Sequence, residues 1–525
     1  MSLEENSRTA RRSGGRAARR EIRSQPLADA LKPVRPGLTG GRYKPLSDAD
    51  VLRIHTAALT VLEEVGFGQA IPTCVEACTR IGAIYEGGRL KFPRALVEDT
   101  VAKAARHFVL CGQDPRHDME PRDKKVYYGT AGAAVHVVDL ETRSYRESYL
   151  QDLYDSARIV DRMDNIHFFQ RTMVPRDLED PREMDINTLY AAISGTSKHV
   201  GSSMVSPEHV EEAFQILHRV AGSEEKWRAR PFVSQSNCFV VPPMKFAEDA
   251  CRCLEVAVRG GMPVLLLSAG QAGATAPAAI AGAVVQAVAE CLCGLVYVNA
   301  LKPGHPAIFG TWPFVSDLRS GAMSGGSPEQ ALLTAACGQM AHFYDLPGGS
   351  AAGMADSKEP DIQAGYEKGI TTALAGLAGL NLVYESAGMH ASLLGFSLES
   401  LIIDNDILGM AERCVRGIEV NDETLSVETI KDVCLNGPGH YLGHSQTLSL
   451  MQREYIYPEI GNRLSPKEWA EVGKPDILKL AIARKRDLLA GHFPRHIAGD
   501  VDAAIREHHP IRLPRAQMRP AYQPA

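Results

Sequence analysis

Between residues 100 and 390, short β-rich runs alternate with longer stretches whose composition fits helices. Parallel neighbouring strands need a crossover of about a dozen or more residues, usually a helix, and eight strand–helix repeats are typical of a (β/α)8 barrel. We therefore predict an α/β fold built on a (β/α)8 TIM barrel. The predicted strands are His107–Cys111 or in its place Val126–Gly129, then Ile166–Gln170, His199–Val205, Phe232–Asn237, Val264–Ala269, Pro306–Trp312, Gly348–Ala352 and Leu382–Ser386, and the predicted crossover helices include Ser206–Val220, Met244–Gly260, Pro277–Val298, Pro328–Phe343 and Asp361–Leu380.

A doubly wound sheet is the rival architecture. Its phosphate-binding fingerprint is missing, because no G-x-G-x-x-G follows a predicted strand and no G-x-x-x-x-G-K-[ST] occurs in the sequence. The barrel is therefore favoured.

The segments on either side of the barrel differ in character. Residues 1–44 combine seven arginines between Arg8 and Arg23 with a Pro/Gly-rich linker, so we expect a solvated tail; an arm for nucleic acid or anionic lipid is the alternative. Ser47 precedes an apolar periodicity and predicts a capped helix that ends at Gly66. We expect an N-terminal helical extension over 45–105, the barrel over 106–400 and a C-terminal helical region over 401–525.

Composition narrows the class of protein. A net charge of -6 and 45% apolar residues are ordinary for a globular chain, so we expect neither a nucleic-acid partner nor a membrane protein. The richest apolar stretch, 274–300, is interrupted by Gln286, Glu290 and Asn299, which argues against a membrane span. The same stretch leads us to expect a homo-oligomer. Eleven cysteines with no secretory leader indicate reduced thiols and a cytoplasmic location.

Two kinds of motif raise the question of a metal site. Cys251-x-Cys253 and Cys291-x-Cys293 fall in predicted helices, where side chains two positions apart diverge by about 200° and cannot share one ion. Buried structural thiols are the favoured interpretation. His440 and His444 lie among glycines, which favours a loop. We predict no metal site; a zinc-dependent transferase that uses these Cys and His residues remains an alternative.

In a (β/α)8 barrel, catalytic groups lie at the carboxyl ends of the strands. The predicted strand ends offer amides, glycines and aromatic side chains but no acid/base pair at an obvious spacing and no G-x-S-x-G nucleophile elbow. The run from Phe309 to Phe314 contains one of only three tryptophans, and aromatic faces attract a quaternary ammonium ion. A core or subunit-contact role is the alternative. Tyr344 and Tyr384 are further candidates for an aromatic cage.

The segment from Gly348 to Asp361 is the most distinctive in the sequence. Its small residues allow backbone or a bulky planar group to approach closely. Charged residues resume at Asp356 and Lys358, and these could equally begin a solvated helix.

The sequence of this region resembles that of a known protein family. The stretch GMADSKEPDIQAGYEKGITTALAGLAGLNLVYESAGM, followed by LIIDNDI, resembles the trimethylamine methyltransferase family of corrinoid-dependent enzymes. FVLCGQDP, NIHFF, GMPVLLLSAG, GSPE and DLPGGS extend the similarity over most of residues 45–500. The resemblance implies a (β/α)8 barrel that moves a methyl group from a methylated amine to the cobalt of a separate corrinoid protein.

The resemblance also identifies a departure from the family pattern. Matching Asp356, Lys358, Pro360 and Asp361 to the family motif puts Met354 where the best-known archaeal members carry pyrrolysine. Pyrrolysine offers an electrophilic imine, and a thioether has no such site. Members without pyrrolysine resemble enzymes that demethylate quaternary amines such as glycine betaine.

Physical chemistry also favours a quaternary amine as the substrate of a member without pyrrolysine. A quaternary nitrogen has no lone pair to add to an imine, and its positive charge allows it to leave as a neutral tertiary amine when a methyl carbon is attacked. Such a transfer needs alignment and desolvation more than proton transfer. The cofactor would supply the nucleophile.

These arguments define the predicted function: methyl transfer from a betaine-like quaternary amine to the Co(I) of a separate corrinoid protein. The usual cobalamin-binding motif D-x-H-x-x-G has no match, so we expect cobalamin to arrive on the partner and none to be tightly bound here. Two alternatives are a trimethylamine methyltransferase that works without pyrrolysine and a non-catalytic protein that binds quaternary amines. The predicted site comprises Met354 and Asp356 as catalytic positions, with Met354 in the pocket wall nearest the cobalt; Phe309, Trp312 and Tyr384 facing the ammonium; Glu385 as its counter-charge; and Gln235, Asn237, His390 and Lys358 as donors to a substrate carboxylate.

Overall fold

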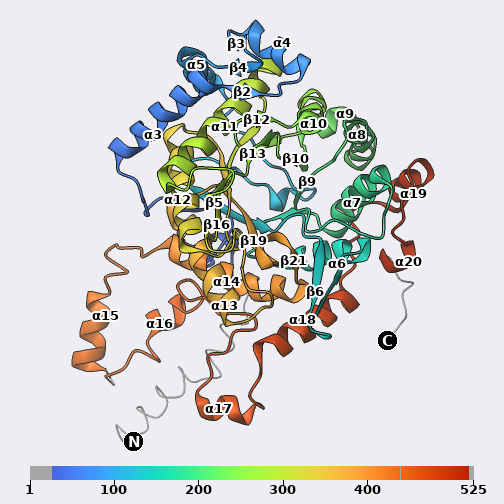
Figure 1. Cartoon of the computed structure of the whole chain (residues 1–525). Coiled ribbons are helices and arrows are strands. Elements are labelled where there is room, and N and C mark those ends of the chain that lie inside the picture. The colour runs from blue at the N-terminus through green and yellow to red at the C-terminus, as the bar shows by residue number, and fades with distance from the viewer. Residues whose placement is uncertain (1–26, 438, 519–525) are drawn as a thin grey trace, which may run out of the picture.

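The computed structural model describes residues 27–437 and 439–518 (Figure 1). The Arg-rich part of the predicted tail, residues 8–23, lies outside the described residues.

Eight parallel strands form a closed barrel in chain order, since the first strand pairs with both the second and the eighth. The predicted barrel is therefore confirmed. For the first strand the alternative Val126–Gly129 is right and His107–Cys111 is wrong, because that run forms only a single bridge, between Leu110 and Met119. The barrel strands are β5 (Lys125–Thr130), β8 (Phe168–Gln170), β9 (His199–Ser202), β10 (Val233–Asn237), β13 (Val264–Ser268), β15 (Ala307–Thr311), β18 (Gly348–Ala351) and β19 (Leu382–Ala387).

Helices connect these strands on the outside of the barrel (Figure 1). Local signals set several of their ends. The Ser327 hydroxyl accepts from the Gln330 N–H at the start of α12, and the Asp361 carboxylate accepts from the Ala364 N–H at the start of α13. The outer helices are α6 (Leu150–Val160), α7 (Pro181–Gly195), α8 (Pro207–Ala221), α9 (Glu224–Ala229), α10 (Glu248–Arg259), α11 (Ile280–Leu301), α12 (Pro328–Phe343), α13 (Ile362–Ala378) and α14 (Leu398–Arg416).

The two faces of each barrel strand carry different side chains. On the inner face, a Cβ added at Gly349 would lie 2.9 Å from the Tyr384 ring and 3.0 Å from Ile308. On the outer face, the Phe309 ring packs against Tyr344 at the end of α12, with ring centroids 5.6 Å apart. Because successive strand residues point to opposite faces, Ile308 and Gly310 face inward while Phe309 faces the helices.

An N-terminal unit packs on the barrel through α11. Ser47 caps α3 as predicted, and the helical segment ends at Gly66, whose φ is 61°. Helices α3, α4 and α5 all pack on α11. The unit comprises α3 (Asp48–Thr60), the π-helix η2 (Val61–Val65), α4 (Pro72–Arg80), α5 (Arg94–Lys103) and a small sheet of β2 (Phe67–Gly68), β3 (Ile84–Glu86), β4 (Arg89–Lys91), β11 (Val240–Val241) and β12 (Lys245–Phe246).

Helix α11 contains the apolar stretch noted in the sequence. Among the described residues it is the one helix long and apolar enough to cross a membrane, and 72% of its most apolar window is buried inside the fold. Its Glu290 carboxylate accepts hydrogen bonds from Ser268, Gln286 and the Met244 N–H. Most of this helix is therefore an internal packing element.

The segments that follow the strands build two further small sheets at the carboxyl ends of the barrel. One connects the loops after β13 and β15, and the other connects those after β5 and β19. They consist of β14 (Gln271–Ala272), β16 (Phe314–Ser316) and β17 (Met323–Ser324), and of β6 (His136–Asp139), β7 (Ser144–Glu147), β20 (Met389–His390) and β21 (Gly395–Phe396).

The C-terminal region is helical, and one part of it leaves the body of the protein. We call residues 418–450 the arm; its helices α15 and α16 lie to one side of the barrel (Figure 1). After the arm, α18 returns to pack on α14 and α6. The region contains α15 (Val427–Lys431), η5 (Asp432–Asn436), α16 (Ser445–Leu450), α17 (Pro466–Glu471), α18 (Ile477–Gly491), α19 (Gly499–His508) and α20 (Arg515–Met518).

Candidate active site

Glu385 occupies an unusual position at the carboxyl end of β19. Its φ is 63°, in the left-handed region that non-glycine residues rarely adopt, and the pairing of β19 with β5 shifts register between Val383 and Ala387. Strain of this kind costs about 1–3 kcal/mol and clusters at functional sites. The backbone irregularity therefore marks this strand end as a candidate site.

The environment of the Glu385 carboxyl group is equally unusual. The side chain is buried, and the only donor to it among the described residues is the Gly132 N–H, which lies 3.1 Å from each carboxylate oxygen. Burial raises the pKa of Glu385 to about 8, against the opposing effects of the Gly132 N–H and the Lys368 ammonium. A neighbouring cation would reverse this shift, because it favours the ionised carboxylate.

Aromatic rings line the barrel next to Glu385. The Tyr384 ring centroid lies 5.1 Å from that of Trp312 and 5.0 Å from that of Phe168. All three rings are buried, and Trp312 Nε1 has no acceptor among the described residues. Phe168 on β8, Tyr384 on β19 and Trp312 directly after β15 thus bring three aromatic rings together at the strand end that carries Glu385.

Gln170 completes the inner surface, and its position depends on two glycines. A Cβ at Gly132 would lie 3.1 Å from Gln170 Cγ and 3.4 Å from Glu385 Oε1, so the two side chains flank this residue. A Cβ at Gly201 would lie 1.8 Å from Gln170 Oε1, which only glycine permits. Ser236 donates to the same oxygen over 3.4 Å. The sequence identified Gln170 as a strand-end residue but did not assign it to the site.

Met354 lies in a loop that is fixed on several sides. The side chain is fully buried against Gly325, where an added Cβ would lie 2.9 Å from Met354 Cβ. Asp356 accepts hydrogen bonds from the Ser324 hydroxyl (2.6 Å), the Gly325 N–H (2.7 Å) and the Ser392 hydroxyl (2.5 Å). Asp356 therefore joins three loops and holds the backbone that carries Met354.

Helix α13 lies outside the barrel and holds both the Met354 loop and, through Asp404, the segment that follows Glu385. Its Glu367 carboxylate accepts from the Asp356 N–H over 2.8 Å. The adjacent Lys368 forms a buried ion pair with Asp404 at 2.6 Å, and Asp404 also accepts from the Gly388 N–H, three residues after Glu385. No sequence signal distinguished these inward-facing charges from a solvated helix face.

Four of the predicted site residues whose side chains are described do not join the cluster around Glu385. Phe309 faces the outer helices, and Gln235 lies on the outer face of β10 because its neighbour Ser236 contacts Gln170 inside. Lys358 is exposed, and its ammonium donates to the Asp356 carbonyl. His390 is buried, with Nε2 2.7 Å from the Ser400 hydroxyl, and burial lowers its pKa well below the usual value. Asn237 ends β10.

The cysteine pairs lie in helices α10 and α11 as predicted, and all four thiols are buried. Residues 439–444 include the predicted loop, and His444 caps α16 by accepting from the Gln446 N–H. Within the described residues, no group of three or more His, Cys, Asp or Glu side chains has an arrangement that could hold a metal ion.

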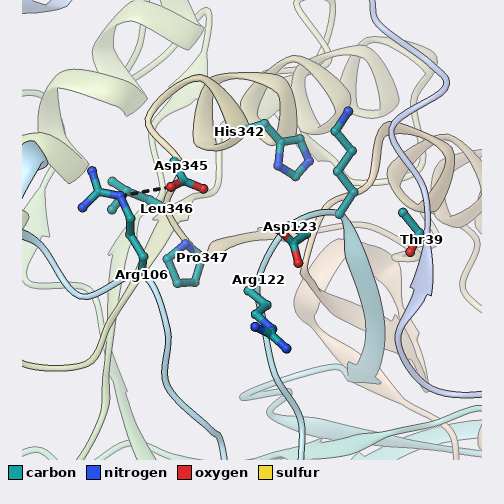
Figure 2. A pocket seen from close by; sticks show the side chains of 9 residues that line it. Thr39, Arg106, Arg122, Asp123, His342, Asp345, Leu346 and Pro347 are labelled. Atoms are coloured by element: carbon teal, nitrogen blue, oxygen red, sulfur yellow. Dashed lines mark ion pairs between the residues drawn. The ribbon is translucent and has the colours of Figure 1, made fainter.

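Two cavities lie at the opposite end of the barrel from Glu385. One, of about 280 Å³, is lined by Lys124 just before β5 and by Pro347 just before β18 (Figure 2). In it the Arg106 guanidinium pairs with Asp345 over 3.1 Å. The other, of about 1250 Å³, is lined by Lys198 just before β9. The amino ends of the strands are the end that stabilises such barrels, so neither cavity is a candidate for the reaction.

Comparisons with known proteins agree on the family. The sequence profile of the trimethylamine methyltransferase (MTTB) family matches residues 12–512. The chain is 30% identical to a trimethylamine methyltransferase MttB of Desulfitobacterium hafniense (strain DSM 10664 / DCB-2), over 92% of this chain and 96% of that protein. It is also 30% identical to a glycine betaine methyltransferase of Desulfitobacterium hafniense (strain Y51), over 89% and 96%.

A solved structure supports the fold alone. The monomethylamine methyltransferase MtmB of Methanosarcina barkeri superposes with a TM-score of 0.51 at 12% identity, over 89% of this chain and 90% of that chain.

Proposed function

The chain belongs to the trimethylamine methyltransferase family, and from this premise we propose that it transfers a methyl group from a quaternary amine to a reduced corrinoid on a separate protein. The observation that carries the proposal is the buried carboxyl group of Glu385, which directly follows Tyr384 on β19, at the strand end where the Tyr384 ring packs against Trp312. A corrinoid, when bound over the site, supplies the nucleophile that receives the methyl group.

The inner surface suits a permanent cation. A quaternary ammonium ion has no N–H donor, so it is recognised by aromatic faces and by negative charge rather than by hydrogen bonds. Glu385 has one backbone N–H for its two oxygens, and it lacks a paired side chain within the described residues. A bound cation would favour the ionised form of the Glu385 carboxyl group. The positive charge of the cation would then balance the negative charge of the carboxylate.

The same surface lacks what a neutral amine would require. Addition of an amine lone pair needs an electrophile. By the family resemblance, Met354 stands at the pyrrolysine position, and its thioether is not an electrophile. With a quaternary amine the N–CH3 bond breaks, both electrons remain on nitrogen, and a neutral tertiary amine leaves.

The chain's own contribution is then alignment and exclusion of water. The Asp356 bonds to Ser324, Gly325 and Ser392 fix the Met354 loop, so that the buried thioether can form a dry wall on the side from which the methyl group departs. Glu385 and the aromatic rings would hold the nitrogen at the opposite end.

The carboxyl end of the barrel also offers a docking surface for the corrinoid partner. Val205, Leu318 and Leu394 are exposed on loops that follow β9, β15 and β19. Exposed apolar residues around a mouth are typical of an interaction site. We propose that the corrinoid protein contacts this rim, because there the cofactor would face the inner surface of the barrel.

The experiment is a panel of amines, each incubated with the protein and chemically reduced cobalamin while methylcobalamin is followed by its absorbance. We expect a quaternary amine such as glycine betaine to give methylcobalamin and an equal amount of tertiary amine, and Glu385→Gln to give little of either. If only trimethylamine is active, the proposed substrate class is wrong. If quaternary amines bind and none is demethylated, the protein is a binding protein instead.

A further inference from the structure

The three tryptophans of the chain differ in how their indole N–H groups are bonded. Trp227 Nε1 donates to the Gly260 carbonyl over 3.1 Å, and Trp469 Nε1 donates to the Pro475 carbonyl over 3.4 Å. Trp312 is 4% exposed, yet its Nε1 has no acceptor among the described residues. A buried indole N–H usually finds a hydrogen-bond partner. The missing acceptor at Trp312 therefore points to a group that the protein itself does not supply.

The backbone directs the Trp312 side chain to the inside of the barrel. The Trp312 backbone N–H donates to the Ser268 carbonyl over 2.8 Å, so the pairing of β15 with β13 continues past the end of β15. Trp312 lies two residues after Gly310, which faces inward, and alternate residues of a strand share a face. The indole N–H therefore belongs to the inner surface of the site and not to the layer of outer helices.

Strand register places Trp312 level with Tyr384. Gly310 pairs with Gly349, and two residues further along the same strand Ala351 pairs with Tyr384. Trp312, Ala351 and Tyr384 therefore form one row across three neighbouring strands. Ala351 is small, which lets the two rings meet with their centroids 5.1 Å apart. Its methyl group cannot accept a hydrogen bond, so this neighbour leaves the Trp312 N–H unsatisfied.

The Tyr384 hydroxyl is a second unused donor in this row. Burial raises the pKa of the hydroxyl, and no described residue forms a hydrogen bond with it, so the hydroxyl keeps its proton. An indole N–H and a protonated phenol can each donate one hydrogen bond. Two donors on adjacent rings, with no acceptor from the described residues, suit a ligand group that carries two acceptor oxygens.

Glu385 has the opposite requirement. It directly follows Tyr384 on β19, and its buried carboxyl group has one N–H for two oxygens. A cation would satisfy Glu385, whereas an acceptor would satisfy Trp312 and Tyr384. A molecule that carries both a quaternary nitrogen and a carboxylate meets these requirements together.

We propose that Trp312 Nε1 and the Tyr384 hydroxyl bind a carboxylate of the substrate and so select betaines over quaternary amines that lack a carboxylate. This inference rests on the proposed function and narrows its substrate class. Hydrogen bonds to a charged acceptor are about twice as strong as those between neutral groups. A carboxylate therefore gains more from these two donors than the neutral hydroxyl of choline does.

The test compares two ligands that share a quaternary nitrogen and differ in the carboxylate. Glycine betaine and tetramethylammonium are each titrated into the full chain by calorimetry. We expect the wild type to bind glycine betaine at least about tenfold more tightly. Trp312→Phe and Tyr384→Phe each keep an aromatic ring and remove one donor. Either should weaken binding of glycine betaine roughly 10-fold to 100-fold, and that of tetramethylammonium by less than about threefold.

The matched control is Trp469→Phe, the same substitution at a tryptophan whose N–H the protein itself satisfies. The control should bind both ligands like the wild type, and circular dichroism of every variant should match the wild type. Equal affinity of the wild type for the two ligands would overturn the proposal. Equal losses for both ligands in the folded Trp312 and Tyr384 variants would overturn it as well, and so would choline binding as tightly as glycine betaine.

These results are distinguishable from a failure of the proposed function. If tetramethylammonium or choline gives methylcobalamin as efficiently as glycine betaine does, the assignment of a carboxylate site is wrong and the methyl transfer stands. If no quaternary amine gives methylcobalamin, the proposed function is wrong and the inference falls with it.

Discussion

The two ends of the barrel each bury an ionisable group whose pKa is shifted to about 8 by burial, yet the two groups are surrounded differently. At the amino ends, the Lys198 ammonium donates to the carbonyls of Val160, Met163 and Ile166 at 2.7, 2.6 and 2.5 Å. At the carboxyl ends, Glu385 shares a single N–H between two oxygens. Burial alone does not identify a functional residue. The difference lies in whether the protein itself satisfies the buried group.

The largest expected effect tests the amino end. Lys198→Met would leave three buried carbonyl groups without their donor, so we expect the free energy of unfolding to fall by about 3–5 kcal/mol. Urea denaturation would measure it. A loss below about 1 kcal/mol would show that these carbonyls find other partners, and the comparison between the two ends would fail.

The corresponding substitution at the carboxyl end should lower catalytic activity without lowering the stability of the fold. Glu385→Gln removes the counter-charge, and we expect kcat/KM for a quaternary amine to fall roughly 100-fold or more, on the order of 3 kcal/mol at an effective dielectric constant near 20. Steady-state kinetics would measure it.

The same Glu385→Gln substitution should not lower the stability of the folded protein. Because the folded pKa of Glu385 is raised to about 8, its contribution to stability is fully present below the unfolded pKa and is lost as the pH rises toward 8. The glutamine variant should therefore be at least as stable as the wild type at pH 8. A marked loss of stability would mean that Glu385 serves the fold.

A smaller effect distinguishes Phe309 on the outer face of β15 from Trp312, which follows the strand and faces inward. Trp312→Leu should raise the dissociation constant for the cation about tenfold, since a cation–π contact contributes roughly 1–2 kcal/mol when desolvated. Phe309→Leu should leave binding unchanged and lower the free energy of unfolding by about 1–2 kcal/mol, because Phe309 packs on Tyr344. Calorimetric titration and urea denaturation of both variants would measure the two quantities. Equal losses of affinity would contradict the assignment of the inner and outer faces.

The smallest effect concerns the loop of Met354. Asp356→Asn keeps the shape of the side chain but removes its charge, so the bonds from Ser324, Gly325 and Ser392 should weaken. We expect kcat to fall roughly threefold to tenfold with little change in KM. Ser206→Ala is the matched control, because Ser206 bonds an exposed carboxylate, that of Glu208, far along the chain from this loop. A change in KM alone would contradict a role in alignment.

The fold was largely predictable because strand and helix patterns are local. The eight strands follow from short β-rich runs, and Ser47, Ser327 and Asp361 cap helices in the way that their sequence positions suggest. The first strand was ambiguous, since His107–Cys111 and Val126–Gly129 are both short β-rich runs and only pairing with β19 decides between them.

The site was less predictable because it depends on which face of a strand a residue occupies. Phe309 and Trp312 are three positions apart in one aromatic run, yet only Trp312 reaches Tyr384. The register shift that makes Glu385 unusual depends on the partner strand and leaves no local signal. Family resemblance supplied the reaction class and the position of Met354, and it could not supply these contacts.

The most direct test of the account is calorimetric titration of glycine betaine into the protein at pH 7 in two buffers with different ionisation enthalpies. With a pKa of about 8, Glu385 is mostly protonated before binding, so we predict the release of about 0.9 proton per cation bound. Affinity should rise about tenfold per pH unit below pH 8 and level off above it. Binding without proton release, or no binding by any quaternary amine, would contradict the central claim that Glu385 is the counter-charge of a permanent cation.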